Sequence, residues 1–308
     1  MGGLYYITHG AIATIHFTGE IMGNLISTPL LVLFTCSLIS VSATAEAWTV
    51  QGSDVRAQPQ DTVWVITTHI KADKQDQFEQ FMDEFRALGN QTVVDDPDFA
   101  PAYESTRILY PAGANEDGTF TYFMVIDPII TGFAFSINDI LERYLPEPEA
   151  KLLHSTFTES LASPQHQWVT LQSELGLLKA ANDDTVWIVR YPVYEDKKEQ
   201  FEQFTEAIWD MGMDAEVLSS NIREAIYRTR VLYPTQADED GYYSYFFVMD
   251  PHITGIDYSI QNMLQHFYPH DQVDLQYQLF EESIAGPLEE WTVVQQDGKV
   301  QVEVVMEE

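Results

Sequence analysis

The chain has 308 residues, enough for two domains of ordinary size, and 45% of them are hydrophobic, enough for a packed core. Its 48 acidic residues outnumber 15 basic ones, which gives a formal net charge of −33 at pH 7. Such a polyanion repels nucleic acids and anionic membrane surfaces, so both are excluded as partners. The acidity fits either a solvated surface suited to a saline medium or a cationic partner.

An apolar run begins at Leu30 and ends near Val41, and small residues around Ala45 follow it. This pattern is typical of a secretory signal peptide, and cleavage would leave Trp48 as the first residue. We therefore expect a periplasmic or secreted protein with no membrane contact after cleavage. Residues 1–47 contain no Lys or Arg, unlike an ordinary signal peptide, and a start at Met22 instead of Met1 is an alternative.

The chain then repeats itself at an offset of 123 residues. The motif DTVW at 61–64 recurs at 184–187, FEQF at 78–81 recurs at 201–204, and LYP at 109–111 recurs at 232–234. No gap is needed between 61–168 and 184–291, and over a third of these positions are identical. The sequence therefore predicts a duplicated domain. The predicted segments are an N-terminal extension with signal peptide (1–47), two repeats (61–173 and 184–296), a linker (174–183) and a C-terminal hairpin strand (297–308).

Each repeat is predicted to run strand, helix, strand, strand, helix, strand. The first helix carries apolar residues from Phe78 to Leu88 on one face, and Gly89 and its counterpart Gly212 are expected to end it. Strands are expected at 103–110 and 120–126, and at 225–233 and 242–249 in the second repeat. Prolines should split the second helical region of each repeat into two short helices: Pro146, Pro148 and Pro269.

This order is the ferredoxin-like α+β arrangement, in which helices cover one face of an antiparallel sheet. Both faces of the strand at 120–126 are apolar, with Tyr122 and Met124 on one face and Phe123 and Val125 on the other. The second face must therefore be covered, and the other repeat is the obvious source.

In topology, residues 61–296 resemble the dimeric α+β-barrel superfamily, which includes antibiotic-biosynthesis monooxygenase-like proteins. The resemblance implies two ferredoxin-like units packed sheet to sheet as a pseudo-dimer within one chain. The sequence shows no diagnostic catalytic motif of that group, so the resemblance implies no particular activity.

Motifs that bind a cofactor or a metal are missing. The sequence has no dinucleotide-binding or Walker glycine loop, no His-Glu-x-x-His and no nucleophile elbow. His252, His266 and His270 have no histidine counterparts in the first repeat, which favours ordinary surface histidines over metal ligands. We expect neither a cofactor nor a metal.

The strongest polar candidates are two arginines inside apolar strands, Arg107 and Arg230, each followed by a strand that ends in Asp127 or Asp250. One interpretation is a structural ion pair within each repeat, Arg107 with Asp127 and Arg230 with Asp250. The other is that an arginine points into a cavity between the sheets and holds a ligand carboxylate or an oxyanion. Aromatic side chains of the central strands would either pack the core or line that cavity: Tyr110, Tyr122, Tyr233 and Tyr245.

The leading hypothesis is a protein that binds a small, largely apolar molecule between the two sheets. One alternative is a cofactor-independent monooxygenase-like enzyme that uses the same cavity. Another is a structural protein with a filled barrel that self-associates through its edges. A cavity of about 300 Å³ or more would favour the first two over the third.

Overall fold

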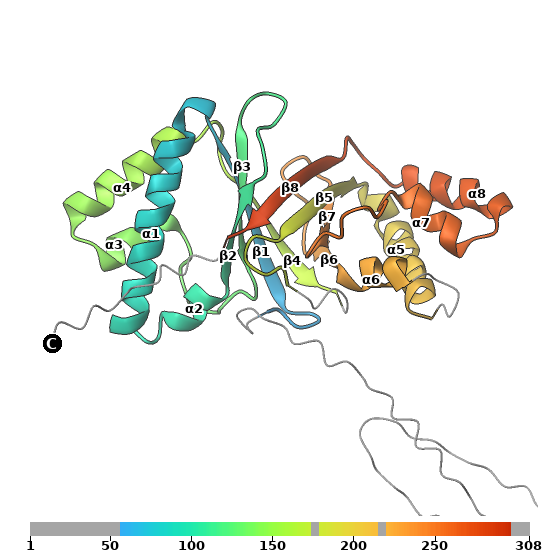
Figure 1. The fold of residues 1–308 in the computed structure, drawn as a ribbon, viewed down its shortest axis with the longest axis horizontal. Coiled ribbons are helices and arrows are strands. Elements are labelled where there is room, and N and C mark those ends of the chain that lie inside the picture. Colours follow the sequence, from blue (N-terminus) through green and yellow to red (C-terminus); the bar gives the residue numbers. More distant parts are fainter. Residues whose placement is uncertain (1–55, 174–178, 215–219, 297–308) are drawn as a thin grey trace, which may run out of the picture. The chain divides into compact units, whose positions relative to one another are not determined.

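Eight antiparallel strands form one closed barrel in the order β1-β3-β2-β8-β5-β7-β6-β4 (Figure 1). The computed structural model describes residues 56–173, 179–214 and 220–296. The strands are β1 (Thr62–Ile70), β2 (Thr106–Pro111), β3 (Phe120–Ile126), β4 (His166–Gln172), β5 (Thr185–Val193), β6 (Thr229–Pro234), β7 (Tyr243–Met249) and β8 (Glu289–Gln295).

The barrel consists of two equivalent half-sheets, one from each copy of the repeat. The first copy supplies β4-β1-β3-β2 and the second supplies β8-β5-β7-β6. Two seams join them, with Leu109 of β2 opposite Gln295 of β8 and Leu171 of β4 opposite Tyr233 of β6. The predicted fold class is therefore confirmed: two β-α-β-β-α-β units form an α+β pseudo-dimer within one chain.

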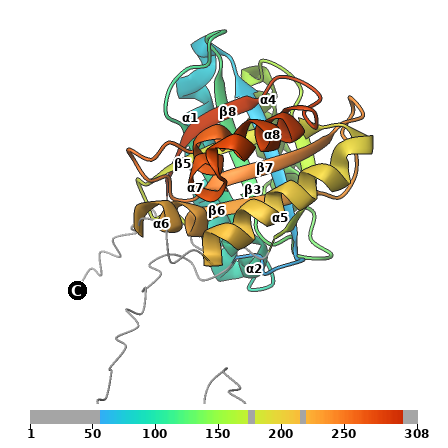
Figure 2. The ribbon, with the colours of Figure 1, turned by 90° about the vertical axis from the view of Figure 1, so that its right-hand side faces the viewer.

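Helices cover the outer face of each half-sheet, so that the barrel lies between two helical layers (Figures 1 and 2). The first layer is α1 (Gln75–Asp95), α2 (Ala100–Glu104), α3 (Ile137–Tyr144) and α4 (Glu147–Ser160). The second is α5 (Lys198–Asp214), α6 (Ser220–Arg228), α7 (Ile260–Phe267) and α8 (His270–Glu281). The breaks between α3 and α4 and between α7 and α8 fall at Pro146 and Pro269, as predicted.

Two local predictions are wrong. Gly89 lies inside α1 and Gly212 inside α5, so neither ends its helix. A Cβ at Gly89 would collide with the ring of Tyr103, which shows that this glycine permits close packing of α2 on α1. The predicted strands at 103–110 and 225–233 also begin too early, because Tyr103 belongs to α2 and Ala225 to α6.

Side chains fill the interior of the barrel. Alternate residues of each strand point inward, among them Val65, Phe123, Ile188 and Phe246, which are at most 3% exposed. The remaining interior cavity is about 10 Å³. Branched and aromatic side chains from both copies meet there and leave little room for a ligand at this point between the two sheets.

The proposed signal segment (1–47) and the proposed C-terminal strand (297–308) lie outside the described residues. Among the residues that are described, none of the helices combines the length and apolar character needed to cross a bilayer.

Candidate functional site

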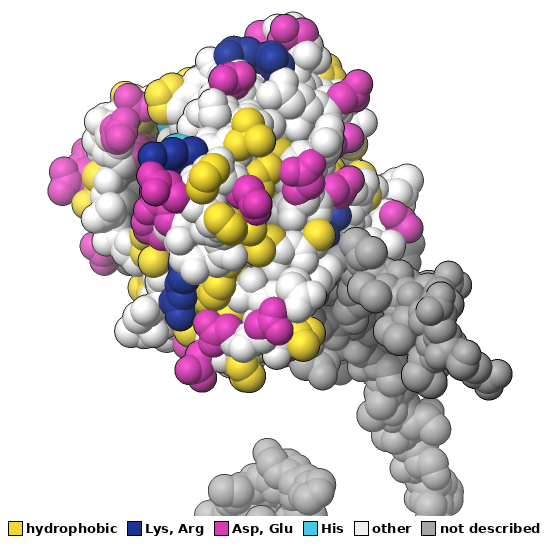
Figure 3. Space-filling model, turned by 90° about the vertical axis from the view of Figure 1, so that its left-hand side faces the viewer, with side chains coloured by type: hydrophobic (Ala, Val, Ile, Leu, Met, Phe, Trp, Pro, Cys, Tyr) yellow, Lys and Arg dark blue, Asp and Glu magenta, His cyan; other side chains and the backbone are white. Residues whose placement is uncertain are grey.

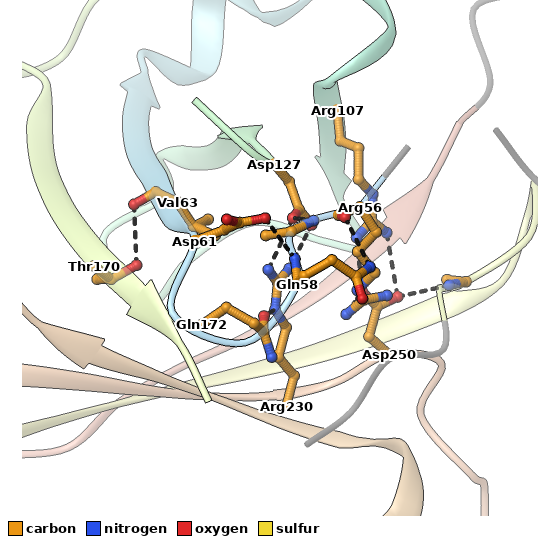
Figure 4. A network of polar contacts seen from close by, with 12 residues as sticks. Arg56, Gln58, Asp61, Val63, Arg107, Asp127, Thr170, Gln172, Arg230 and Asp250 are labelled. Carbon is orange, nitrogen blue, oxygen red and sulfur yellow. Dashed lines mark hydrogen bonds and ion pairs between the residues drawn. The ribbon is translucent and has the colours of Figure 1, made fainter. Parts of the chain in front are cut away.

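A buried ionic cluster closes the end of the barrel where β3 and β7 finish (Figure 4). Arg107 of the first copy donates to both carboxylate oxygens of Asp250 of the second, at 2.6 and 3.2 Å. Arg230 of the second copy donates to both oxygens of Asp127 of the first, at 2.5 and 2.9 Å. All four side chains are at most 3% exposed.

This crossed arrangement corrects the predicted pairing within each copy. Arg107 lies opposite Val125 in the β2–β3 ladder, and its long side chain extends across the barrel end instead of returning toward Asp127. The two ion pairs therefore connect the two copies and do not tie together the two strands of one hairpin.

Equivalent residues of both copies complete the cluster. Gln295 accepts from Nε of Arg107 at 2.9 Å, and Gln172 accepts from Nε of Arg230. The backbone N–H groups of Ala57 and Ala180 donate to Asp127 and Asp250, each at 2.7 Å. Arg56 and Lys179 also stand at equivalent positions. The repeat therefore begins before Asp61, the residue at which the sequence motifs predicted its start.

The electrostatics of the cluster follow from its burial. Burial alone would raise the pKa of Asp127, but Arg230 and Arg56 outweigh it and lower that pKa to about 2. Burial likewise opposes ionisation of Asp250, and Arg107 and Arg56 hold its pKa below the ordinary value. Burial and the charge of Arg230 lower the pKa of Arg56 to about 9.

The four predicted tyrosines lie outside the barrel, in the layers between sheet and helices. Tyr110 and Tyr122 pack in the core beneath α1, where the Tyr122 hydroxyl donates to Glu79 at 2.7 Å. Tyr233 and Tyr245 pack beneath α5, where the Tyr245 hydroxyl donates to Glu202 at 2.6 Å. The structure thus separates these tyrosines from the arginines and aspartates with which they were grouped.

A mostly apolar cavity of ligand size lies in the first copy, between the sheet and helices α1 and α2. Its volume is about 320 Å³. Most of its wall is apolar, from Phe85, Leu88, Phe99, Ile108, Met124, Phe133, Phe135 and Ile140. Of the eight predicted ligand-binding residues, Arg107 alone is among the residues that line it.

The corresponding space in the second copy measures about 60 Å³. Larger side chains fill it: Trp209 stands where the first copy has Arg86, and Phe247 stands where it has Met124. The aligned repeats show this difference in side-chain size. The positions that are identical in both copies do not indicate it.

Polar groups are concentrated in two parts of the cavity wall. On the helical side, the Tyr103 hydroxyl donates to Oδ1 of Asn90 at 2.8 Å, and Arg86 donates to the Tyr110 hydroxyl. At the β2–β8 seam, the cavity reaches the ionic cluster through Arg107, Lys179 and Gln295. The site can therefore hold an apolar body and also contact a polar group.

Within the described ranges, no three His, Cys, Asp or Glu side chains gather in a way that could hold a metal ion. His252, which the sequence singled out, packs its ring against Trp187 and Tyr258.

Neither the family models nor the curated proteins contain a match to this chain. Similar solved structures include an anthrone oxidase-like protein (14% identity, TM-score 0.41, covering 79% of this chain and 94% of that chain). A proposed monooxygenase from Fusobacterium nucleatum has 13% identity and a TM-score of 0.40, covering 78% of this chain and 94% of that chain. A heme-binding protein from Thermus thermophilus has 10% identity and a TM-score of 0.39, covering 79% of this chain and 96% of that chain.

Proposed function

We propose that the protein binds one small, largely apolar molecule in the cavity of its first copy. The observation that carries this proposal is the difference between the copies. The same fold element is open at about 320 Å³ in one copy and filled to about 60 Å³ in the other. A cavity of this size and lining falls at the lower end of the range for small-molecule sites.

The second copy supports the proposal because it shows that this fold can pack with a much smaller cavity. A void of several hundred Å³ costs stability, since its walls lose van der Waals contacts. In the second copy, Trp209 and Phe247 occupy most of this space and reduce that cost. The first copy has Arg86 and Met124 at these positions. A bound molecule would supply the missing contacts in the first copy.

Native mass spectrometry of protein purified from its source tests the proposal. Met124→Phe copies the residue at the equivalent position of the second copy and should fill part of the cavity. We expect the wild-type protein to retain a small molecule and Met124→Phe to lose it. The matched control Phe247→Met changes the equivalent residue of the second copy and should retain the molecule. Equal retention by both variants would show that the molecule lies elsewhere, and no retained molecule in any of them would count against the proposal.

We also propose that the chain is a tandem, antibiotic-biosynthesis monooxygenase-like member of the dimeric α+β barrels, and that it acts in the periplasm or outside the cell. The repeated topology and the two seams between the copies support the first point. The apolar run before Ala45 supports the second. Amino-terminal sequencing of protein from its natural host should begin at or near Trp48, and recovery of residues 23–45 would contradict export by cleavage.

A further inference from the structure

We propose that the molecule held in the first copy carries a single anionic group, such as a carboxylate, which binds at the Lys179 end of the cavity. This inference rests on the proposed function and names the chemical class of its ligand. It stands on the distribution of charge around the cavity.

The polar end of the cavity is cationic where it is most deeply buried. Arg107 is 4% exposed and Lys179 is half-buried, and both line the cavity at the β2–β8 seam. Glu104 is the acidic residue of the lining, and it is exposed to solvent. Among the described residues, the ionic cluster at this end holds more cations than carboxylates: Arg56, Arg107, Arg230 and Lys179 against Asp127 and Asp250. In a chain with a net charge of −33, whose acidic side chains are spread over the helical face of the first copy (Figure 3), this buried excess of positive charge favours an anion.

Burial and the neighbouring charges of Arg107 and Arg56 disfavour the charged form of Lys179. Asp127 and Asp250 act in the opposite direction without compensating, and the pKa of Lys179 is lowered to about 8. An anion bound beside Lys179 would offset this by adding a negative charge close to the ammonium group. The Lys179 end of the cavity would then supply charge-assisted hydrogen bonds, and the apolar wall would bury the rest of the molecule.

The second copy gives an internal comparison. Its small residual space is lined by Thr229 and Val231, while Arg230 between them points into the barrel and does not line that space. Among the described residues, the space beneath the helices thus reaches the ionic cluster in the first copy, where that space is open, and not in the second.

The test uses matched pairs of probes that differ only in charge: benzoate and benzamide, naphthoate and naphthamide, decanoate and decanamide. Binding to the full-length protein is measured by calorimetry at neutral pH. We expect at least one carboxylate to bind about 10- to 100-fold more tightly than its amide, because a hydrogen bond to a charged group contributes more than a neutral one. Lys179→Met should reduce this preference to within about threefold and leave the affinity for the amide unchanged.

Lys151→Met is the control for the loss of one positive charge, because Lys151 is 72% exposed on α4, paired there with Glu147. It should leave the preference unchanged. Equal binding of acid and amide by the wild-type protein would overturn this inference and leave the proposed function standing. The same holds if the preference persists in Lys179→Met. Failure of every probe to bind would overturn both.

Discussion

Arg230 and Asp127 belong to different copies of the repeat, 103 residues apart in the chain, and meet in a buried bidentate ion pair. With its counterpart between Arg107 and Asp250, this pair connects the two half-sheets across the end of the barrel. A buried charge that loses its partner is costly, so the cluster makes the stability of each copy depend on the other.

Arg230→Met should lower the free energy of unfolding by about 3 to 5 kcal/mol, because Asp127 would remain buried without its main partner. Urea unfolding followed by circular dichroism measures the change. Arg228→Met, two residues away, removes the pair with Glu224 on the surface of α6, where both side chains are partly exposed, and should cost less than about 1 kcal/mol. A loss for Arg230→Met no larger than the loss for Arg228→Met would contradict a structural role.

The ion pairs should also make the protein sensitive to acid. The folded-state pKa of Asp127 is lowered to about 2, below its unfolded value, so its contribution is complete above about pH 4 and is lost as the pH falls toward 2. The pKa of Asp250 is lowered as well, which extends the loss to lower pH. The free energy of unfolding should therefore fall steeply below about pH 4 in the wild-type protein and less steeply in Arg230→Met. Parallel pH profiles for the two proteins would show that Asp127 does not depend on Arg230.

Lys179 should also make the protein more stable as the pH rises, in this case in the alkaline range. Its folded-state pKa is lowered to about 8 from 10.5, so between these values the unfolded chain binds more protons at this residue than the folded chain. The contribution of Lys179 to stability therefore rises with pH across that window. Lys179→Met removes this dependence. The free energy of unfolding of the variant minus that of the wild-type protein should therefore decrease from pH 7 to about pH 10. Chemical unfolding of both proteins at several pH values measures the difference, and a gap that stays constant would refute it.

A single copy, residues 56–173, should not remain a folded monomer. Separation from the second copy would expose the edges of β2 and β4 and the apolar inner face of the half-sheet. Two such chains could rebuild both seams with each other, because each carries Arg107 and Asp127. Size-exclusion chromatography with light scattering should show dimers or larger species. A monomer that unfolds cooperatively would mean that the crossed ion pairs and the seams are dispensable.

The repeat was the part of the fold that sequence reasoning could predict, because identical motifs at a constant offset require no knowledge of packing. The antiparallel order and the proline breaks before α4 and α8 follow from local patterns and are correct. The partner of Arg107 could not be predicted in this way. A strand pattern places Arg107 and Asp127 on the same face, but only the closed barrel shows that Asp250 is within reach.

The cavity was missed for a related reason. Tyr122 and Met124 were correctly assigned to one face of β3, yet periodicity does not say whether the residues above that face fill the space. That depends on the sizes of Arg86 and Met124 in one copy and of Trp209 and Phe247 in the other. Comparison of side-chain volumes between the copies would have indicated which one is open.

The fusion of both halves into one chain has a consequence for how such a protein can change. In a dimer of identical chains, every substitution appears twice, so one pocket cannot be closed without closing the other. Here Met124 and Phe247 are encoded separately, and each half can vary on its own. One copy can therefore fill its core, while the other keeps a cavity open.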